Sequence, residues 1–332
     1  MTLRFGLLGA GRIGKVHAKA VTSDANARLV AVADAMPAAA DAIARQYGCE
    51  VRTIDAILTA KDIDAVVICT PTDTHADLIE KFVKAGKAVF CEKPIDLSLA
   101  RVKTCLEVVR AAKGTLMVGF NRRFDPHFAA VKAEIGKGSI GEVEMITITS
   151  RDPGAPPIDY IKRSGGIFRD MTIHDFDMAR WLLDEDVTEV SAMAAVLVDK
   201  AIGEAGDSDS VQVMLKTASG KMAIISNSRR ATYGYDQRIE VHGSKGVVSA
   251  ENQRPVSIEV ANGLGYTRPP LHDFFMTRYT EAYAAEISGF IKAVTAKTAA
   301  NPSGEDGLNA LALAEAALKS VKEGRTVKMS EV

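Results

Sequence analysis

The sequence has no excess of charge of either sign, because 41 lysine and arginine residues are balanced by 42 aspartate and glutamate residues. It also has no run of basic residues, so we expect neither a nucleic acid nor an anionic membrane as its partner. No stretch approaches the roughly 18 consecutive apolar residues of a membrane-spanning helix. The chain opens on a strand pattern rather than on a charged segment followed by an apolar one, so we do not expect a secretory signal. These absences predict a cytoplasmic protein.

Cysteine is scarce and has no CxxC spacing. Three of the four cysteines lie within or beside apolar stretches, so we expect buried free thiols in a reducing compartment rather than disulfides or metal ligands. The four residues are Cys49, Cys69, Cys91 and Cys105. No low-complexity tract or repeat is present, and a chain of 332 residues is long enough to bury a sizeable core in two domains.

What the sequence does contain begins with a glycine-rich turn after the first apolar run, Gly9-Ala10-Gly11-Arg12-Ile13-Gly14. Helical spacing follows, and a second apolar run ends in Asp34. Strand, glycine loop, helix, strand and terminal acid in this order form the dinucleotide-binding fingerprint. Gly9 permits the tight turn, Gly11 lets the backbone approach a pyrophosphate, and Gly14 lets helix and strand pack closely. The N-terminus of the helix offers its N–H groups to the phosphates.

The acid at the end of the second strand also predicts which dinucleotide is bound. The Asp34 carboxylate can accept hydrogen bonds from a ribose 2′-hydroxyl, and it repels a 2′-phosphate. Ala35 follows it, where an arginine would favour the phosphorylated cofactor. The sequence therefore favours NAD over NADP, although a basic residue elsewhere in the chain could still accommodate the phosphate.

The order of the predicted elements divides the chain near Phe120. Up to that point strands and helices alternate, which predicts a parallel sheet covered on both faces. Beyond it, strands follow one another without long helices, which predicts a largely antiparallel sheet. We therefore expect an α/β fold with an NAD-binding domain at 1–120 and a substrate-binding domain at 121–332. About sixty residues at the C-terminal end return to helical periodicity, and these helices are expected to pack against both domains.

The individual elements follow from the spacing of apolar residues. In the first part we expect strands at 3–8, 29–33, 63–69, 88–91 and 116–119, and helices after Gly14 and at 37–47, 74–86 and 98–113. In the second part we expect strands at 142–150, 189–198, 210–217, 221–228, 237–242 and 246–250, and helices at 126–137, 172–183, 274–297 and 304–323.

Two further strand ends in the first part are polar. They read Thr70-Pro71-Thr72-Asp73-Thr74-His75 and Glu92-Lys93-Pro94, and ligands of a doubly wound sheet bind at the carboxyl ends of its strands. An ammonium group there could donate a hydrogen bond to a reacting oxygen and stabilise the charge that develops on it. Most lysines are solvated surface charges, but Lys93 directly follows a buried strand and precedes a proline that rigidifies the turn. We therefore predict Lys93 as a catalytic residue.

A second group of chemically active residues lies in the segment GGIFRDMTIHDFD at 165–177. Asp170 and His174 are four residues apart, so on a helix they share one face. A histidine can accept the proton of a substrate hydroxyl, and a carboxylate one turn away could orient the imidazole or bind a neighbouring hydroxyl. Spacing alone favours the plainer alternative of a capping aspartate and a partly buried histidine. We expect no metal ion here, since no second histidine lies at ligand spacing.

Polar and aromatic residues that could bind a polyol follow several of the predicted strands. A polyol needs many hydrogen-bond donors and acceptors and little charge, which such residues could supply. Most residues of this kind are structural, as arginines in ion pairs and as tyrosines half inside a core. The candidate segments are Asn121-Arg122-Arg123-Phe124-Asp125, Arg151-Asp152-Pro153 and Tyr233-Gly234-Tyr235-Asp236.

With these segments in place, the sequence resembles the Gfo/Idh/MocA oxidoreductase family over nearly the whole chain. The EKP motif is family-wide, whereas GGIFRDMTIHDFD and YGYDQRIEV are narrower and point to the branch that acts on inositols. The shared segments are GLLGAGRIGKVHA at 6–18, CTPTDTH at 69–75, CEKP at 91–94, GFNRRFDP at 119–126, SGGIFRDMTIHDFDMARWL at 164–182, YGYDQRIEVHGSKG at 233–246 and GEDGLNALALAEAALKS at 304–320.

The resemblance implies a Rossmann domain followed by an α/β domain with a large open sheet, usually assembled as a homotetramer. It implies that Lys93, Asp170 and His174 are the catalytic residues. His174 would take the proton from the oxidised hydroxyl, Asp170 would support it, and Lys93 would polarise or relay at the same oxygen. The Lys93–Pro94 peptide bond would be cis.

The resemblance also implies two sets of binding residues. The cofactor would contact Gly9, Gly11, Arg12, Ile13, Gly14, Asp34, Thr70, Pro71, Thr72, His75, Glu92 and Lys93. The polyol would contact Lys93, Arg122, Asp152, Asp170, His174 and Tyr233 or Tyr235. Asn121 is a departure, because inositol-oxidising members often carry an apolar residue there, and it leaves the preferred inositol isomer open.

These observations predict NAD-dependent oxidation of a ring hydroxyl of myo-inositol to 2-keto-myo-inositol. The nearest alternative is the same chemistry on scyllo-inositol, glucose or another cyclic polyol or pyranose, for which fold and catalytic residues would be unchanged. A more distant one is a non-catalytic NAD-binding regulator, which predicts loss of the lysine or the histidine, and the sequence keeps both. NAD-assisted glycoside cleavage shares the fold motif but ought to lack the inositol-type segments.

Overall fold

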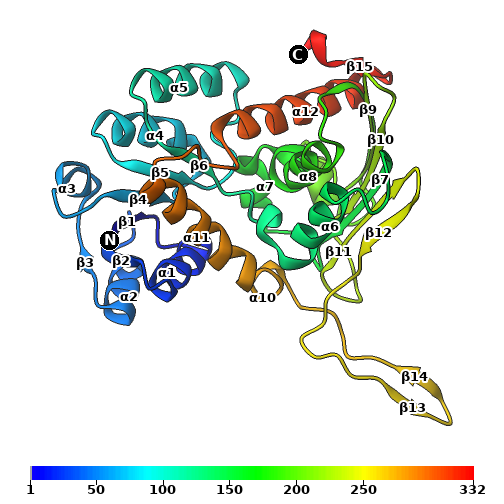
Figure 1. Cartoon of the computed structure of the whole chain (residues 1–332), viewed down its shortest axis with the longest axis horizontal. Coiled ribbons are helices and arrows are strands. Elements are labelled where there is room, and N and C mark those ends of the chain that lie inside the picture. The colour runs from blue at the N-terminus through cyan, green and yellow to red at the C-terminus, as the bar shows by residue number, and fades with distance from the viewer. Residues whose placement is uncertain (1) are drawn as a thin grey trace. The chain divides into compact units, whose positions relative to one another are not determined.

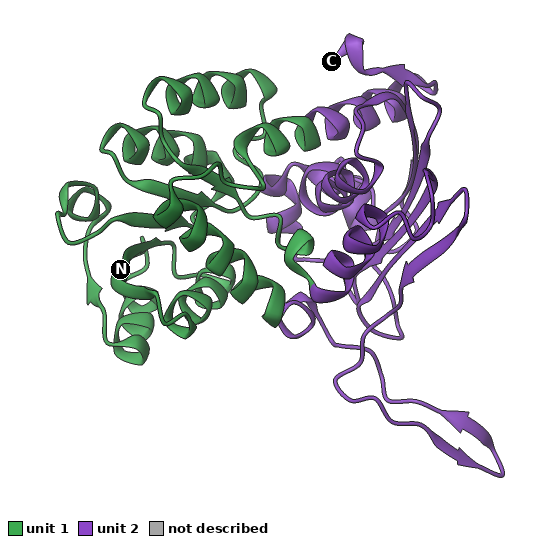
Figure 2. Cartoon of the chain, in the orientation of Figure 1, with its two compact units in different colours: residues 1–125, 280–311 green, residues 126–279, 312–332 purple. Residues whose placement is uncertain are grey.

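The computed structural model describes residues 2–332, which form two compact units (Figure 1, Figure 2). The first unit contains the chain up to Asp125 and the later segment Thr280–Leu311. The second contains Pro126–Tyr279 and Ala312–Val332. The last division falls inside the long helix α12 (Gly304–Glu323). Among the helices of residues 2–332, none combines the length and the apolar character needed to cross a membrane.

The first unit is built on a six-stranded parallel sheet with the order β3-β2-β1-β4-β5-β6. This is the doubly wound order of dinucleotide-binding folds. β4 and β5 are buried along their whole length, because helices cover both faces of the sheet, and they therefore read as continuous apolar runs. The strands are β1 (Leu3–Leu8), β2 (Ala27–Ala33), β3 (Glu50–Val51), β4 (Ala65–Ile68), β5 (Ala88–Cys91) and β6 (Leu116–Val118).

The helices of the first unit begin and end at recognisable signals. Pro37 lies in the first turn of α2, and Gly48 ends that helix in the left-handed conformation. Thr53 and Ser98 cap α3 and α5, because their hydroxyl oxygens accept hydrogen bonds from backbone N–H groups of the first turn. The helices are α1 (Arg12–Ser23), α2 (Pro37–Tyr47), α3 (Ile54–Thr59), α4 (His75–Lys84), α5 (Leu99–Ala111) and α11 (Thr280–Ala296), with 3-10 turns η1 (Thr72–Thr74) and η2 (Asn121–Phe124).

The predicted alternation of strands and helices in the first part of the chain is confirmed, and with it the parallel sheet. Two short elements, β3 and α3, were not predicted. Both residues of β3 are exposed, so this edge strand has no apolar pattern. Helix α3 has six residues, which is too short for a helical period to stand out.

The second unit is built on a seven-stranded sheet with the order β12-β11-β7-β10-β9-β8-β15. Its neighbouring strands run antiparallel, except for β7 and β10, which run parallel. The predicted mostly antiparallel sheet is therefore confirmed. The strands are β7 (Val143–Arg151), β8 (Val187–Ala195), β9 (Ser210–Thr217), β10 (Met222–Ser228), β11 (Asp236–Gly243), β12 (Gly246–Ala250) and β15 (Val327–Lys328).

One face of this sheet is buried under helices and the other is exposed. In β9, for example, Val213 and Leu215 are buried, whereas Gln212 and Met214 are exposed. Such alternation is typical of an antiparallel sheet that is covered on one side only. The other helical elements of this unit are α6 (Pro126–Gly136), α7 (Ile158–Ser164), the π-helical turn η3 (Phe168–Thr172), α8 (Ile173–Leu183), α9 (Lys200–Glu204), α10 (Phe275–Arg278) and the 3-10 turn η4 (Met329–Glu331).

Two predicted helices differ from the structure. The one expected at 172–183 begins earlier, with the π-helical turn η3. The one expected at 274–297 is divided into α10 and α11, because Tyr279 leaves helical geometry at φ −108° and ψ 22°. Its ring is buried and lies edge-on to Tyr235, so tertiary packing overrides the helical periodicity.

A hairpin of β13 (Val260–Asn262) and β14 (Gly265–Thr267) extends away from the sheet of the second unit (Figure 1). All six strand residues are exposed. The sequence analysis did not predict it, because without a buried face its residues show no alternation of apolar and polar positions.

Candidate active site

The glycine loop of the first unit connects β1 to α1 and requires glycine at two positions. Gly9 has a φ of +97°, and a Cβ atom on it would lie 2.5 Å from the carbonyl oxygen of Cys69. A Cβ atom on Gly14 would lie 2.1 Å from the carbonyl oxygen of Gly9. Gly11 is different, because a Cβ atom there would meet nothing within 4 Å. The backbone at Gly11 therefore faces open space at the N-terminus of a helix, which is where a pyrophosphate binds.

Asp34 follows β2 and joins the end of that strand to the glycine loop. Its Oδ2 accepts a hydrogen bond from the Ala10 N–H at 2.5 Å, and its Oδ1 accepts one from the Met36 N–H at 2.7 Å. A carboxylate has about four acceptor sites, so both oxygens can still accept hydrogen bonds from ribose hydroxyls. The observed geometry fits NAD, with the carboxylate already oriented by the backbone.

His75 connects the two other polar strand ends of the first unit. Its Nδ1 lies 2.8 Å from the carbonyl oxygen of Pro94, and its Nε2 lies 2.8 Å from that of Thr70. The ring is buried, with an exposed fraction of 2%, so it holds the loops after β4 and β5 together. The Lys93–Pro94 peptide bond between these contacts is cis, as expected. Thr70 also shares a 2.6 Å hydrogen bond with the hydroxyl of Thr74.

In the second unit, Asp170 and His174 lie on consecutive turns of different kinds. Asp170 belongs to the π-helical turn η3, and His174 lies in the first turn of α8. The Asp170 carboxylate is held from two sides. Its Oδ1 accepts a hydrogen bond from the Tyr160 hydroxyl at 2.8 Å, and its Oδ2 accepts one from Arg229 at 3.3 Å. These partners fix the carboxylate beside the turn that carries the imidazole.

Arg229 is the functional candidate that the sequence analysis missed. It follows β10 and has an exposed fraction of only 1%. Besides Asp170, the guanidinium lies 3.9 Å from Asp207, so it is a buried cation between two carboxylates. The arginine pair directly after a predicted strand was the one signal that could have pointed to it.

The helix that carries His174 is anchored to the sheet by a buried carboxylate. Asp175 accepts hydrogen bonds from the Ser150 hydroxyl at 2.6 Å and from the Asn227 side-chain amide at 2.8 Å. Ser150 belongs to β7 and Asn227 to β10, the parallel pair at the centre of the sheet. The next residue along α8 from His174 is therefore fixed to two strands, which orients the first turn of the helix.

The four polyol candidates have different surroundings. Arg122 is buried in the turn η2 of the first unit. The backbone N–H of Asp152 donates to the carbonyl oxygen of Ser228 at 2.9 Å, so Asp152 lies at the ends of β7 and β10. Tyr235 is buried, and its ring packs edge-on against Phe274. Tyr235 is therefore a core residue, which is the structural alternative that the sequence left open for the tyrosines of this segment.

Tyr233, the fourth candidate, belongs to a charged hydrogen-bonded group in the second unit, where β7 ends and β11 begins. Its hydroxyl donates to Asp236 at 2.6 Å and accepts from Arg151 at 3.1 Å. Burial alone would raise the pKa of Asp236, but hydrogen bonds from Arg238 and Tyr233 outweigh it, and the pKa lies below its usual value. Burial and the hydrogen bond to Asp236 raise the pKa of Tyr233. The group therefore presents an ionised carboxylate and a neutral phenol.

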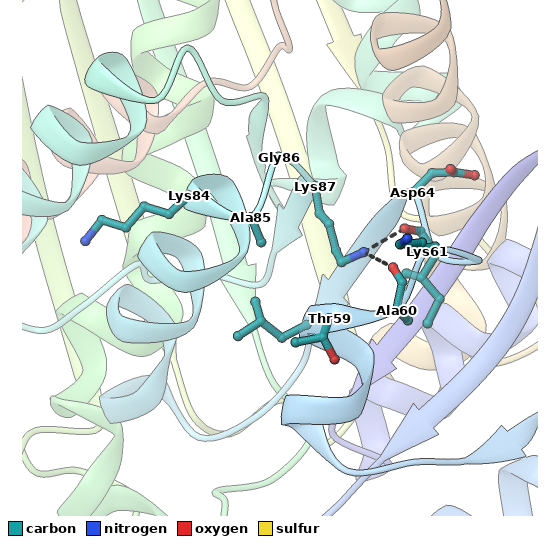
Figure 3. Close-up of a pocket in the computed structure, with 10 residues that line it drawn as sticks. Thr59, Ala60, Lys61, Asp64, Lys84, Ala85, Gly86 and Lys87 are labelled. Carbon is teal, nitrogen blue, oxygen red and sulfur yellow. Dashed lines mark hydrogen bonds between the residues drawn. The ribbon is translucent and has the colours of Figure 1, made fainter.

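A surface hollow of about 890 Å³ lies at the end of the first sheet that is opposite to the glycine loop (Figure 3). It lies at the amino ends of β4 and β5, where Lys87 donates hydrogen bonds to the carbonyl oxygens of Ala60 and Ile63 at 2.6 and 2.8 Å. Ligands of doubly wound sheets bind at the carboxyl ends of the strands. This hollow is therefore not the cofactor site.

Two alanine substitutions in the glycine loop should have opposite effects. Gly14→Ala forces a clash with backbone, so we expect it to destabilise the protein by about 1–3 kcal/mol. Gly11→Ala meets no protein atom, so thermal unfolding should be unchanged, whereas NAD should bind about tenfold more weakly because the methyl group occupies the phosphate position. Thermal unfolding and calorimetric titration with NAD measure both effects. Wild-type NAD affinity in Gly11→Ala would contradict this location of the pyrophosphate.

Comparisons with known proteins agree with this geometry. Residues 3–120 match the oxidoreductase family with an NAD-binding Rossmann fold, and residues 128–249 match the GFO/IDH/MocA C-terminal domain. The chain is 76% identical to inositol 2-dehydrogenase of Rhizobium meliloti strain 1021 over 330 residues, which cover 99% of this chain and 100% of that protein.

Two solved structures are also similar to this chain. A myo-inositol dehydrogenase from Corynebacterium glutamicum superposes with a TM-score of 0.95 at 44% identity, covering 99% of each chain. The scyllo-inositol dehydrogenase of Lactobacillus casei with bound NAD(H) and scyllo-inositol gives a TM-score of 0.93 at 30% identity, covering 99% of this chain and 100% of that one. The chain therefore belongs to the Gfo/Idh/MocA family of oxidoreductases, and its first unit is an NAD-binding Rossmann domain.

Proposed function

We propose that this protein is an NAD-dependent inositol dehydrogenase that oxidises a ring hydroxyl of myo-inositol to give 2-keto-myo-inositol. The observation that carries the proposal is the 76% identity to an inositol 2-dehydrogenase over practically the whole chain. The residues that the chemistry needs are all present, since Lys93, Asp170 and His174 stand in the segments described above.

Each of the three residues has a distinct task in the proposed reaction. NAD, when bound at the glycine loop, supplies the acceptor for the hydride. His174 takes the proton of the oxidised hydroxyl, a task that suits an imidazole because it can gain and lose a proton near neutral pH. Lys93 donates a hydrogen bond to the same oxygen and stabilises the negative charge that develops on it. Asp170, oriented by Tyr160 and Arg229, supports the imidazole or accepts a hydrogen bond from a neighbouring hydroxyl.

The binding residues complete the proposal. Glu92 and the loop Thr70–His75 border the cofactor together with Arg12, Ile13 and Asp34. Asp152 and Tyr233 supply polar contacts to the polyol, since both lie where the central strands β7 and β10 end. Arg122 and Tyr235 are weaker candidates because both are buried. The proposal therefore assigns substrate binding and assembly to residues 121–332, most of which belong to the second unit.

Transfer of deuterium tests the reaction directly. With myo-inositol deuterated at C2, the label should be recovered at C4 of the nicotinamide ring of NADH, and turnover should be slower than with unlabelled substrate wherever hydride transfer limits the rate. Unlabelled NADH formed with the same substrate would mean that another ring carbon is oxidised. Loss of the label to water would contradict direct hydride transfer.

Another cyclic polyol is the second candidate for the substrate. A similar structure has scyllo-inositol and NAD(H) bound, and the buried Asn121 adds a polar group to the turn that carries Arg122. Fold and catalytic residues are the same for both substrates, so only a comparison of turnover on the two isomers separates them. A non-catalytic regulator would not need the proton-accepting histidine or the strand-end lysine.

The exposed face of the second sheet supports assembly into a homotetramer. Large apolar side chains gather on this face, and contiguous exposed apolar surface marks an interaction site. They are Met145, Met193, Met214, Met222, Ile224 and Val247, with exposed fractions between 38% and 77%. Light scattering after size exclusion should give four times the mass of one 35.4 kDa chain. Met214→Glu should lower that mass, because a charge would be buried in the interface, whereas Gln46→Glu on an exposed position of α2 in the first unit is the control.

We also place this enzyme in the cytoplasm, as part of inositol catabolism. All four cysteines are free, and three of them are buried. Burial raises the pKa of Cys69 and Cys91 well above the usual value, so these thiols are unreactive. Free buried thiols fit a reducing compartment.

A further inference from the structure

Three buried titratable side chains meet inside the first unit, near the end of β5. His17 comes from α1, Glu92 directly follows β5, and Glu286 comes from α11. Their exposed fractions are 0%, 8% and 0%. His17 Nε2 lies 2.6 Å from Glu92 Oε1 and 4.0 Å from Glu286 Oε1. The proposed function uses Lys93 and places Glu92 beside the cofactor, but it gives His17 and Glu286 no task.

The cluster holds protons rather than a metal ion. One ligand atom from each residue lies within 4.8 Å of the others, so a histidine and two carboxylates could in principle bind zinc. Zinc–ligand distances of about 2.0 Å in a tetrahedron, however, place two ligand atoms about 3.3 Å apart. The 2.6 Å between His17 Nε2 and Glu92 Oε1 is too short for that arrangement and is the distance of a short hydrogen bond.

Glu286 is the neutral member of the cluster. Within residues 2–332, neither of its carboxyl oxygens has a hydrogen-bond partner, and an ionised carboxylate without partners is very costly to bury. Burial and the nearby Glu92 raise the pKa of Glu286 well above the usual value. The hydrogen bond of His17 Nε2 goes to Glu92 Oε1 instead.

The Glu92 side chain is fixed from more than one side. A Cβ atom on Gly119 would lie 3.2 Å from its carboxylate, so the backbone directly after β6 approaches it closely. Its backbone N–H donates to the carbonyl oxygen of Ile68 at 3.0 Å. On the other side of Lys93, the Pro94 carbonyl is held by His75. Each neighbour of Lys93 in the chain is therefore held by a different buried histidine, Glu92 by His17 and Pro94 by His75.

We propose that His17 is a positioning residue for Lys93: it holds the Glu92 carboxylate inside the unit, beside the neutral Glu286, and thereby fixes the direction in which Lys93 leaves the end of β5. Lys93 is the next residue in the turn after β5, so a fixed Glu92 limits the backbone positions from which the Lys93 side chain can extend. This inference rests on the proposed function only in assigning Lys93 to the reacting oxygen.

Steady-state kinetics with NAD and myo-inositol test the proposal. His17→Leu removes the donor at similar volume, so kcat should fall about 10- to 100-fold, as expected when a catalytic group is misplaced. The KM for the polyol and the Kd for NAD should change less than twofold. His17→Gln can still donate to Glu92 and should restore most of kcat. Val102→Ala, a buried residue of α5, is the matched destabilised control and should keep kcat.

The same experiment can overturn the proposal. Wild-type kcat in His17→Leu, or equal losses in His17→Leu, His17→Gln and Val102→Ala, would mean that the cluster is merely part of the core. If His17→Leu does not fold, Glu92→Gln, which keeps the shape of the side chain, should give the same loss of kcat. Stoichiometric zinc in the purified protein, lost in Glu92→Gln, would also overturn it.

Two measurements need no substrate and so separate this inference from the proposed function. The imidazole N–H proton of His17 should resonate far downfield in the wild type, should move upfield in Glu92→Gln, and should stay in place in Glu286→Gln. Absence of that resonance shift would contradict the His17–Glu92 bond even in an active enzyme. Conversely, an inert wild type that keeps the resonance would contradict the proposed function and leave the His17–Glu92 contact standing.

Glu286→Gln also tests the neutral state of this residue. The titratable groups that face it are His17 on α1, Glu92 after β5 and Cys69 after β4. A carboxyl group that is neutral when folded and ionised when unfolded gives up stability as the pH rises from its unfolded pKa towards its folded pKa. The gain in Tm of Glu286→Gln over the wild type should therefore grow between pH 5 and pH 8. A gain that does not depend on pH would mean that Glu286 is ionised in the folded protein.

Discussion

Replacing His174 by alanine should lower kcat by about 10²- to 10⁴-fold, the usual contribution of a general base. NAD affinity should be unchanged, because the glycine loop and Asp34 belong to the first unit, whereas His174 lies in the second. The fold should persist, since the Asp175 carboxylate anchors α8 to β7 and β10. NADH formation and calorimetric titration with NAD measure the two quantities.

His242 offers a matched control in the same unit. It lies on β11 with its ring about half exposed, and its Nδ1 lies 3.3 Å from Oε2 of Glu144, so His242→Ala should leave kcat unchanged. Asp170→Asn should also lower kcat, because it leaves the buried Arg229 without one of its two carboxylates. Near-normal turnover of His174→Ala would remove this histidine from the mechanism.

Asp34→Ser combined with Ala35→Arg should move the preference from NAD towards NADP by at least about 100-fold. Hydrogen bonds to a charged group contribute about 1.5–3 kcal/mol, which is lost for the NAD ribose, while the arginine gains a bidentate contact with the 2′-phosphate. In the structure Asp34 also orients the loop through Ala10 and Met36. The double variant should therefore bind both cofactors somewhat more weakly than its charge alone predicts.

Single substitutions separate the two contributions. Ala35→Arg alone keeps the repelling carboxylate, so NAD should stay preferred. Asp34→Asn keeps the size of the side chain and removes the charge that repels the 2′-phosphate. The preference for NAD over NADP should therefore fall, but NADP should gain no new contact. Fluorescence titration with NADH and NADPH measures both. A double variant that prefers NAD by the wild-type margin would show that Asp34 does not contact the ribose.

The first unit could be predicted almost completely, because its signals are local. A glycine loop, its helix and the acid after β2 lie within one βαβ unit, and buried parallel strands read as apolar runs. Family, fold class and NAD binding were therefore predicted from the sequence and are confirmed by the matches over 3–120 and 128–249. The site residues stay predictions, and the hydrogen bonds of Asp34 and His75 give them structural support.

The surroundings of Asp170 could not be predicted, because they depend on residues far apart in the chain. Arg229 reaches Asp170 across 59 residues, and His17 reaches Glu92 across 75. Neither pair leaves a periodic or spacing signal. The π-helical turn at 168–172 is likewise set by tertiary contacts rather than by propensity, so the simple four-residue helix spacing of Asp170 and His174 was an incomplete description.

NADH formation at 340 nm with the purified protein tests the central claim most directly. Myo-inositol, scyllo-inositol, glucose and other polyols would each be offered with NAD and with NADP. We expect rapid turnover with myo-inositol and NAD, and at most slow turnover with NADP. Absence of turnover on every inositol, with NAD still bound, would contradict the proposed dehydrogenase activity.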